Sequence, residues 1–187
     1  MNKTSSILKI NEVNVDKIEQ EISKLSEYDW NKWFYRQTVT KFPHGNTKTY
    51  PFIWSQDPIN NIISISQHNQ KSLLWKLIKK EINYLTKKYK GRVVKCMLAK
   101  LPSDKKISPH TDQQYSLVNS YRFHLPIKTD SKVVFYLNSI PYYLERGSWY
   151  EINNQLLHSV DNNSDQDRIH LIVDILSFSF DIKYKVC

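Results

Sequence analysis

The sequence contains few glycines and cysteines and has no long apolar run. Its 187 residues include three glycines and two cysteines, Cys96 and Cys187. Because no run approaches roughly 18 apolar residues, no membrane-spanning helix is expected. Met1–Ile10 lacks the basic start and apolar segment of a secretory signal. We therefore expect a cytoplasmic protein whose two cysteines stay reduced, since no pattern supports a disulfide between them.

Internal repeats are also absent, and no linker is long enough to separate two domains. Hydrophobic residues make up 40% of the chain and aromatic residues 13%, which is enough for a sizeable core. We expect a single domain over residues 1–187. Helical support should come mostly from residues 13–90 and the β core mostly from residues 91–180.

The charge balance is strongly positive and uneven. The net charge is +9, and residues 71–106 contain eleven lysines and Arg92 against only Glu81 and Asp104. A basic patch of this kind can contact nucleic acid or an acidic partner. However, lysine is abundant throughout, and no glycine-rich or aromatic RNA-binding motif is present. We therefore interpret the stretch mainly as a solvated helix surface; no pattern indicates an oligomeric state.

Two segments have helical periodicity. Apolar residues recur at helical spacing over residues 15–27, behind Asn14 as a candidate N-cap. A second amphipathic helix is expected at about residues 70–89, ended by Gly91.

Beyond Gly91 the pattern changes to short strands separated by turn residues. The expected strands are 92–100, 119–127, 132–137, 141–145, 148–152, 156–160 and 168–178. Antiparallel strands that follow helices predict a mainly β (α+β) protein, namely a double-stranded β-helix or jelly roll (cupin-like) braced by N-terminal helices.

One constellation of residues points to metal chemistry. His110 and Asp112 are two positions apart, so on an extended segment both side chains leave the same face. His158 and then Arg168 follow on later strands. Two imidazoles and a carboxylate can hold one face of ferrous iron and leave sites open for a co-substrate and dioxygen. By itself the His-x-Asp pattern is a weak signal and favours a polar turn after Ser108-Pro109; the order of His158 and Arg168 on later strands gives it weight.

Two expected strands carry charge on one face. Arg168, His170 and Asp174 alternate with apolar residues, and Arg122 and His124 do the same on an earlier strand. Buried charge is costly unless it is paired or lines a pocket. A guanidinium binds a carboxylate through two parallel hydrogen bonds, which suits the anchoring of a dicarboxylic co-substrate.

Together these segments resemble the aspartyl/asparaginyl β-hydroxylase-like family of Fe(II) and 2-oxoglutarate-dependent dioxygenases. The resemblance covers residues ~30–176. Its motifs are His44 through Thr49, Ile107 through Asp112, Arg122 through Leu125, Gly147 through Trp149, His158 through Asn162 and Arg168 through Asp174.

The resemblance implies a role for each matching residue. His110, Asp112 and His158 would ligate Fe(II), and Arg168 would hold the distal carboxylate of 2-oxoglutarate. Arg122 and His124 match positions that engage the metal-proximal end of this co-substrate in the animal members.

Asp112 is a departure from the animal members, which lack a carboxylate ligand; with its complete triad the chain is similar to bacterial members. His44 is a candidate for substrate contact, and Asp174 for a hydrogen-bond partner of the site. Five aromatic residues are candidates for lining the pocket: Tyr35, Tyr50, Trp54, Trp149 and Tyr150.

The predicted function is thus hydroxylation of an amino-acid side chain, free or within a peptide or protein, with release of succinate and CO2. Three alternatives stay open at this point. The triad could hold zinc in a metal hydrolase. The chain could be a basic jelly-roll binding protein without catalysis, or the same iron chemistry could act on a methylated nucleic acid.

Overall fold

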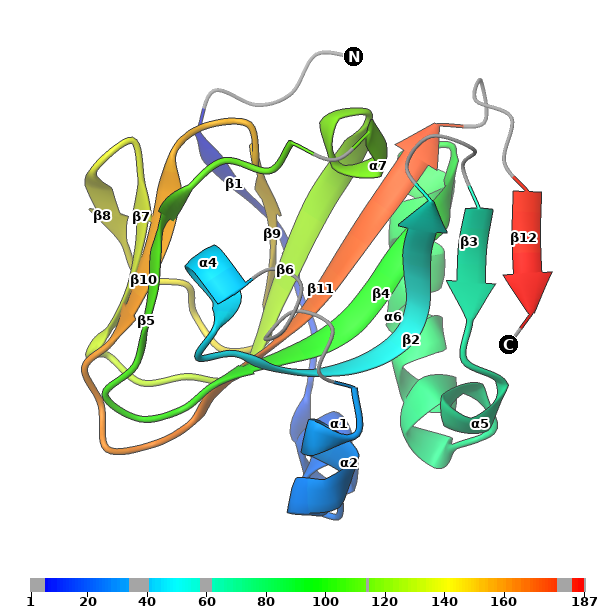
Figure 1. The fold of residues 1–187 in the computed structure, drawn as a ribbon, viewed down its shortest axis with the longest axis horizontal. Coiled ribbons are helices and arrows are strands. Elements are labelled where there is room, and N and C mark those ends of the chain that lie inside the picture. Colours follow the sequence, from blue (N-terminus) through cyan, green and yellow to red (C-terminus); the bar gives the residue numbers. More distant parts are fainter. Residues whose placement is uncertain (1–5, 34–40, 58–61, 114, 178–182, 187) are drawn as a thin grey trace.

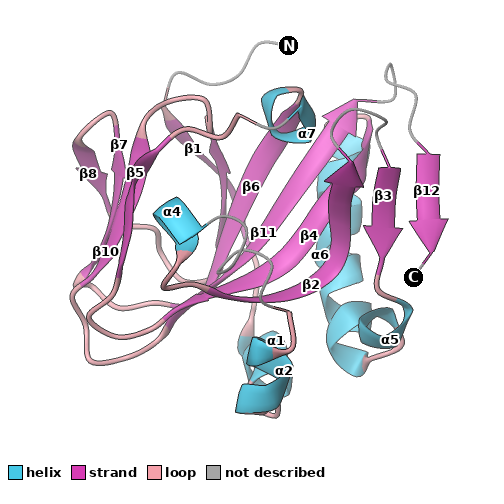
Figure 2. Cartoon of the chain, viewed as in Figure 1, coloured by secondary structure: helices cyan, strands magenta, loops and turns pink. Residues whose placement is uncertain are grey.

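The protein is built from two facing β-sheets with helices on the outer side of the larger one (Figures 1 and 2). The computed structural model describes residues 6–33, 41–57, 62–113, 115–177 and 183–186. The eight-stranded sheet has the order β1 (Ile7–Glu12), β9 (Ser148–Ile152), β6 (Ser120–Lys128), β11 (Arg168–Ser177), β4 (Gly91–Leu101), β2 (Lys48–Asp57), β3 (Ile62–Ile65), β12 (Lys183–Val186). The four-stranded sheet has the order β5 (Lys106–His110), β10 (His158–Asn162), β7 (Val133–Leu137), β8 (Ile140–Tyr142).

Neighbouring strands are antiparallel except for the outer pair β3 and β12. The jelly-roll fold class is therefore confirmed. The seven expected strands all form, with some ends displaced by one or more residues; the expected strand 156–160 begins at His158, for example. The helices are α1 (Asp16–Ile22), α2 (Glu27–Asn31), α4 (Lys41–His44), α5 (Gln67–Gln70), α6 (Leu73–Lys88) and α7 (Tyr115–Val118). None of the helices in these described ranges is long and apolar enough to cross a membrane.

The structure also contains strands that were not expected. The first half of the chain supplies β1, β2 and β3, and β5 precedes the predicted strand 119–127. Pro51 lies inside β2 and Pro109 inside β5. Since proline cannot donate a hydrogen bond to a strand ladder, a segment that contains proline is not expected to be a strand from its sequence pattern.

The predicted helix 15–27 is interrupted: α1 ends at Ile22, and α2 begins behind Ser26. Ser26 and Asp29 form a reciprocal capping box that starts the new helix. Asn14 is not the N-cap of α1. That position is Val15, and the Asn14 side chain instead accepts a hydrogen bond of 2.9 Å from the backbone N–H of Asp16.

Helix α6 confirms the second predicted helix; it begins at Leu73 and ends at Lys88, one residue before the expected end. Lys90 has the positive φ of 46° that turns the chain. Gly91 already belongs to β4, where an added Cβ would lie 2.5 Å from the carbonyl oxygen of Leu176 in β11. The glycine therefore permits close strand packing instead of capping the helix.

The two faces of the larger sheet bury different side chains. One face packs with α1 and α6 in an apolar core whose members include Ile18, Ile78, Leu171 and Val173. The other face points toward the smaller sheet and shares a second apolar cluster with it. The charged residues of β6 and β11 alternate with the first core along their strands, so they lie between the two sheets.

Candidate metal centre

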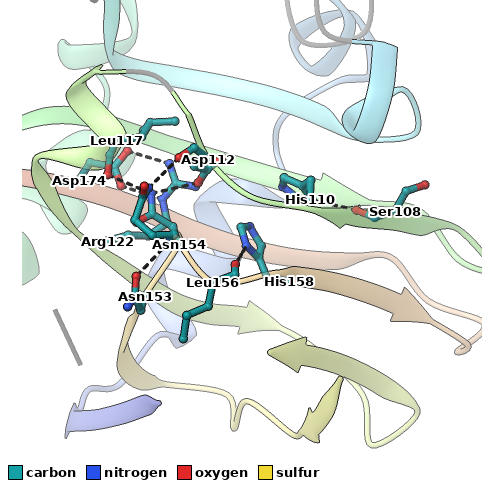
Figure 3. Close-up of polar contacts among 11 residues, drawn as sticks. Ser108, His110, Asp112, Leu117, Arg122, Asn153, Asn154, Leu156, His158 and Asp174 are labelled. Carbon is teal, nitrogen blue, oxygen red and sulfur yellow. Dashed lines mark hydrogen bonds and ion pairs between the residues drawn. The ribbon is translucent and has the colours of Figure 1, made fainter. Parts of the chain in front are cut away.

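His110 and His158 meet on the smaller sheet. They are register partners on β5 and β10, and their ring centroids are 4.1 Å apart (Figure 3). The Nδ1 of His110 lies 2.8 Å from the carbonyl oxygen of Ser108, and the Nδ1 of His158 lies 2.9 Å from that of Leu156. Because a carbonyl only accepts, each Nδ1 carries the proton and each Nε2 keeps its lone pair. This tautomer and its backbone anchor are typical of metal-binding histidines.

Asp112 follows β5 and lies in the same region of the site (Figure 3). Its backbone N–H donates to the carbonyl oxygen of Asn154 at 3.0 Å, and the Asn154 amide donates to its carboxylate at 3.1 Å. The guanidinium of Arg122 donates to the same carboxylate oxygen. Burial works to raise the pKa of Asp112, but the nearby cations, Arg122 first, hold that pKa well below its usual range. Asp112 is therefore an anion.

Arg122 is itself held by Asp174, its register partner on β11. The Nε and Nη2 atoms of Arg122 donate to the two carboxylate oxygens of Asp174 at 2.8 and 2.9 Å. Asp174 is fully buried, and this bidentate pair fixes the plane of the guanidinium. In this structure Arg122 positions Asp112; its expected contact with a co-substrate stays a prediction.

His44 joins the site from a part of the chain distant in sequence. Its ring centroid lies 4.8 Å from that of His110, with the planes nearly perpendicular. One ligand atom each from His44, His110 and Asp112 lies within 4.8 Å of the other two. The sequence offered His44 only as a substrate contact, whereas the structure places it with His110 and Asp112 in a group of three that could hold a metal ion. This group does not include His158.

Both histidines of the smaller sheet are electrically neutral near pH 7. Burial, followed by the neighbouring His158, lowers the pKa of His110 to about 4, and burial lowers the pKa of His158. Neutral imidazole is the form that binds a metal. The donor set of imidazoles and one carboxylate therefore fits a divalent transition metal such as Fe(II).

Arg168, His124 and His170 form a second polar group on the larger sheet. All three side chains are buried; Nη2 of Arg168 lies 2.6 Å from Nδ1 of His170, which lies 3.4 Å from Nδ1 of His124. Burial, followed by the charge of Arg168, holds the pKa of each histidine well below its usual range. Since Arg168 donates to Nδ1 of His170, the proton of that ring is on Nε2, which has no hydrogen-bond partner among the described residues. A buried cation beside a buried donor fits an anionic co-substrate.

An apolar patch borders these polar groups on the same sheet face. It consists of Trp54, Met97, Ala99 and Ile172, and Ile172 is the register partner of both Met97 and His124. The ammonium group of the buried Lys95 lies 4.4 Å from the ring centroid of Trp54.

The aromatic residues expected to line the pocket lie in different parts of the structure. Trp54 belongs to this patch, and Tyr150 lies in the cluster between the sheets. Trp149 and Tyr50 pack in the core on the helix side, so they do not line the site. Tyr35 lies outside the described residues.

A comparison with family models decides the relationship of this chain to known proteins. The model of the aspartyl/asparaginyl beta-hydroxylase family matches residues 12–177. The chain belongs to this family. The match confirms the family that was expected from the sequence, which is described as a hydroxylase family. No curated protein sequence matches the chain.

The comparison with solved structures found matches at low sequence identity. An oxidoreductase of the 2OG-Fe(II) oxygenase family from Burkholderia pseudomallei is 10% identical with a TM-score of 0.52; the match covers 70% of this chain and 66% of that one. A cupin domain from Bordetella pertussis is 18% identical with a TM-score of 0.37, covering 46% of this chain and 84% of that one. About a third of the Burkholderia oxygenase therefore has no counterpart in this match.

Proposed function

We propose that this member of the family is an Fe(II)- and 2-oxoglutarate-dependent dioxygenase in which His110, Asp112 and His158 hold the iron. The observation that carries the proposal is the pairing of His110 with His158. Two histidines in register on adjacent strands, each with Nδ1 bound to a backbone carbonyl, present two Nε2 donors beside an ionised carboxylate.

Arg168 is proposed to hold the distal carboxylate of 2-oxoglutarate. Its guanidinium is buried and stays protonated, so it offers a fixed positive charge without taking up or releasing a proton. His124 and His170 add neutral polar groups next to it. With iron and 2-oxoglutarate bound, the site would use dioxygen to insert one oxygen atom into a C–H bond, releasing succinate and CO2.

The chain's own residues supply position and protection. Arg122 and Asn154 orient the carboxylate of Asp112, and the backbone carbonyls orient the two imidazoles. The apolar patch around Trp54 and Ile172 borders the polar groups and would exclude water beside the reacting C–H bond. We propose an amino-acid side chain, free or within a peptide or protein, as the substrate, and the cytoplasm as the place of action.

The proposal is tested by following succinate formation from 2-oxoglutarate by the iron-loaded protein, with free amino acids and cell-extract peptides as substrates. We expect substrate-stimulated succinate formation and a product heavier by one oxygen atom. His110→Ala and His158→Ala should abolish it, whereas Gln113→Ala, an exposed change next to Asp112, should not. Normal turnover by either histidine variant would remove the iron assignment. Zinc-dependent hydrolysis without use of 2-oxoglutarate would favour the hydrolase alternative.

A further inference from the structure

His44 stands out because the proposed iron site does not use it. We propose that His44 is a fourth, exchangeable metal ligand that occupies a coordination position until substrate displaces it. This inference rests on the proposed function, since it assumes that His110, Asp112 and His158 form the permanent site.

Distance is the first argument for ligation by His44. The ligand atoms of His44, His110 and Asp112 approach one another within 4.8 Å, which allows a single ion to contact all three. The His158 ring lies 4.1 Å from that of His110 by centroids, on the same strand pair. His158 is not part of that group of three, and His110 is the residue next to both histidines, since its ring centroid lies 4.8 Å from that of His44 and 4.1 Å from that of His158.

The local structure holds His44 in place by its backbone. Both the N–H and the hydroxyl of the buried Thr47 donate to the carbonyl oxygen of His44, at 2.9 and 2.8 Å. The Asn46 amide donates a hydrogen bond of 3.2 Å to the carbonyl oxygen of Lys106. This bond connects the segment to the first residue of β5. These bonds give the His-x-Asn-Thr segment a physical role, because they hold the segment where the imidazole of His44 lies next to the strand that carries His110.

The element that carries His44 differs from those that carry the other ligands. His110 and His158 sit on paired strands, whereas α4 is a single short turn lying between β5 and β2 (Figure 1). His44 is only half-buried. Displacing the ring of His110 or His158 would break its hydrogen bond from Nδ1 to a backbone carbonyl, so these two rings are the more permanent ligands.

The number of coordination positions explains why exchange would matter. Three permanent protein ligands and a bidentate co-substrate leave one of six octahedral positions for dioxygen. If His44 occupies that position, the ion is closed to dioxygen until substrate moves the ring aside. His44 would thereby link oxygen access to the presence of substrate.

The experiment is an anaerobic titration with Co(II), followed by its visible absorption, which reports both affinity and coordination number. The variants are His44→Ala, His158→Ala and, as a matched control, Gln113→Ala. We expect His44→Ala to bind Co(II) about tenfold more weakly or worse, the loss that even an outer partner of a metal ligand causes, and its spectrum to differ from that of the wild type, because water then replaces an imidazole nitrogen on the ion. His158→Ala should lose binding, and Gln113→Ala should match the wild type.

The outcomes separate this inference from the proposed function. If His44→Ala titrates with wild-type affinity and spectrum while His158→Ala loses binding, the role of His44 is refuted and the proposed site stands. If His158→Ala binds like the wild type while His44→Ala does not, the proposed triad is wrong. If the wild type does not bind Co(II), both fail. Far-ultraviolet circular dichroism of each variant shows whether it is folded, and Thr47→Val, which removes one bond to the His44 backbone, should weaken Co(II) binding less than His44→Ala.

Discussion

Arg122 and Asp174 are direct partners across strands β6 and β11, joined by two hydrogen bonds of 2.8 and 2.9 Å. The same guanidinium reaches Asp112, so three buried charged groups connect the middle of the larger sheet to the candidate metal centre. Buried ion pairs of this kind contribute modest net stability, but losing one partner is costly because the other charge is then buried without a counter-charge. The geometry of the proposed carboxylate ligand therefore depends on a residue that does not touch the site itself.

Asp174→Asn tests this dependence. The substitution keeps the shape but removes one carboxylate from Arg122, and we expect the free energy of unfolding to fall by about 3 kcal/mol. Co(II) affinity should fall by about tenfold, because Asp112 is then more tightly engaged by a guanidinium that has lost its other anion. Urea unfolding and metal titration measure the two effects. Glu145→Gln, an exposed change, is the control. Unchanged metal affinity in folded Asp174→Asn would show that Asp174 has no influence on the metal site.

Arg168→Lys and Arg168→Ala test the co-substrate anchor. Both variants should raise the KM for 2-oxoglutarate by about tenfold or more while changing the iron requirement much less, since lysine lacks the planar fork of arginine. Steady-state turnover with varied 2-oxoglutarate and varied iron distinguishes the two requirements. If the KM for 2-oxoglutarate stays at the wild-type value in Arg168→Ala, the anchor lies elsewhere.

The buried pair His124 and His170 predicts how stability depends on pH. Each pKa is lowered by burial, so the unfolded chain takes up protons that the folded chain does not, and stability falls as pH drops below the unfolded value of about 6.5. Each residue should contribute roughly 1 kcal/mol of loss between about pH 7.5 and about pH 5.5. Urea midpoints of the metal-free protein at these two pH values measure it.

His170→Gln should reduce that pH dependence, because glutamine does not titrate. The control for this prediction is Gln166→Ala on the exposed turn before β11, which should keep the wild-type slope. An identical slope in the wild type and in His170→Gln would show that His170 is not held neutral.

Adjacent residues at the end of α6 should respond in opposite directions. Gly91→Ala places a Cβ 2.5 Å from the Leu176 carbonyl oxygen and 2.7 Å from the Ile175 side chain; overpacking of this kind costs about 1–3 kcal/mol. Lys90→Gly relieves a positive φ of 46° and should gain up to about 1 kcal/mol. Urea unfolding measures both, and a neutral Gly91→Ala would refute the close approach of β4 to β11.

The sequence predicted the parts of this site that depend on strand periodicity. The alternation in β11 and β6 placed Arg168, His170 and Arg122 on one face, because side chains on a strand repeat every two residues. The pairing of Arg122 with Asp174 and with Asp112 could not be predicted, since strand register and sheet order are not encoded in a local pattern. Arg122 was therefore expected to contact the co-substrate, whereas in the structure it donates to the carboxylates of Asp112 and Asp174.

His44 shows the same limitation. Its segment resembled a family motif, but its proximity to His110 depends on where β2 and β5 lie, and prolines obscured both strands in the sequence. The hydrogen bonds of Thr47 to the backbone of His44 are local, so that part of the motif was accessible to reasoning about turns.

The central claim is that one site binds iron and 2-oxoglutarate together through His110, Asp112 and His158. The most direct measurement is the visible charge-transfer absorption that appears only when 2-oxoglutarate chelates Fe(II), recorded without oxygen for the wild type, His110→Ala and His158→Ala. We expect the band in the wild type, saturating at one equivalent of iron per chain, and its loss in both variants. A wild type without the band, or a band of equal strength in both histidine variants, would contradict the claim.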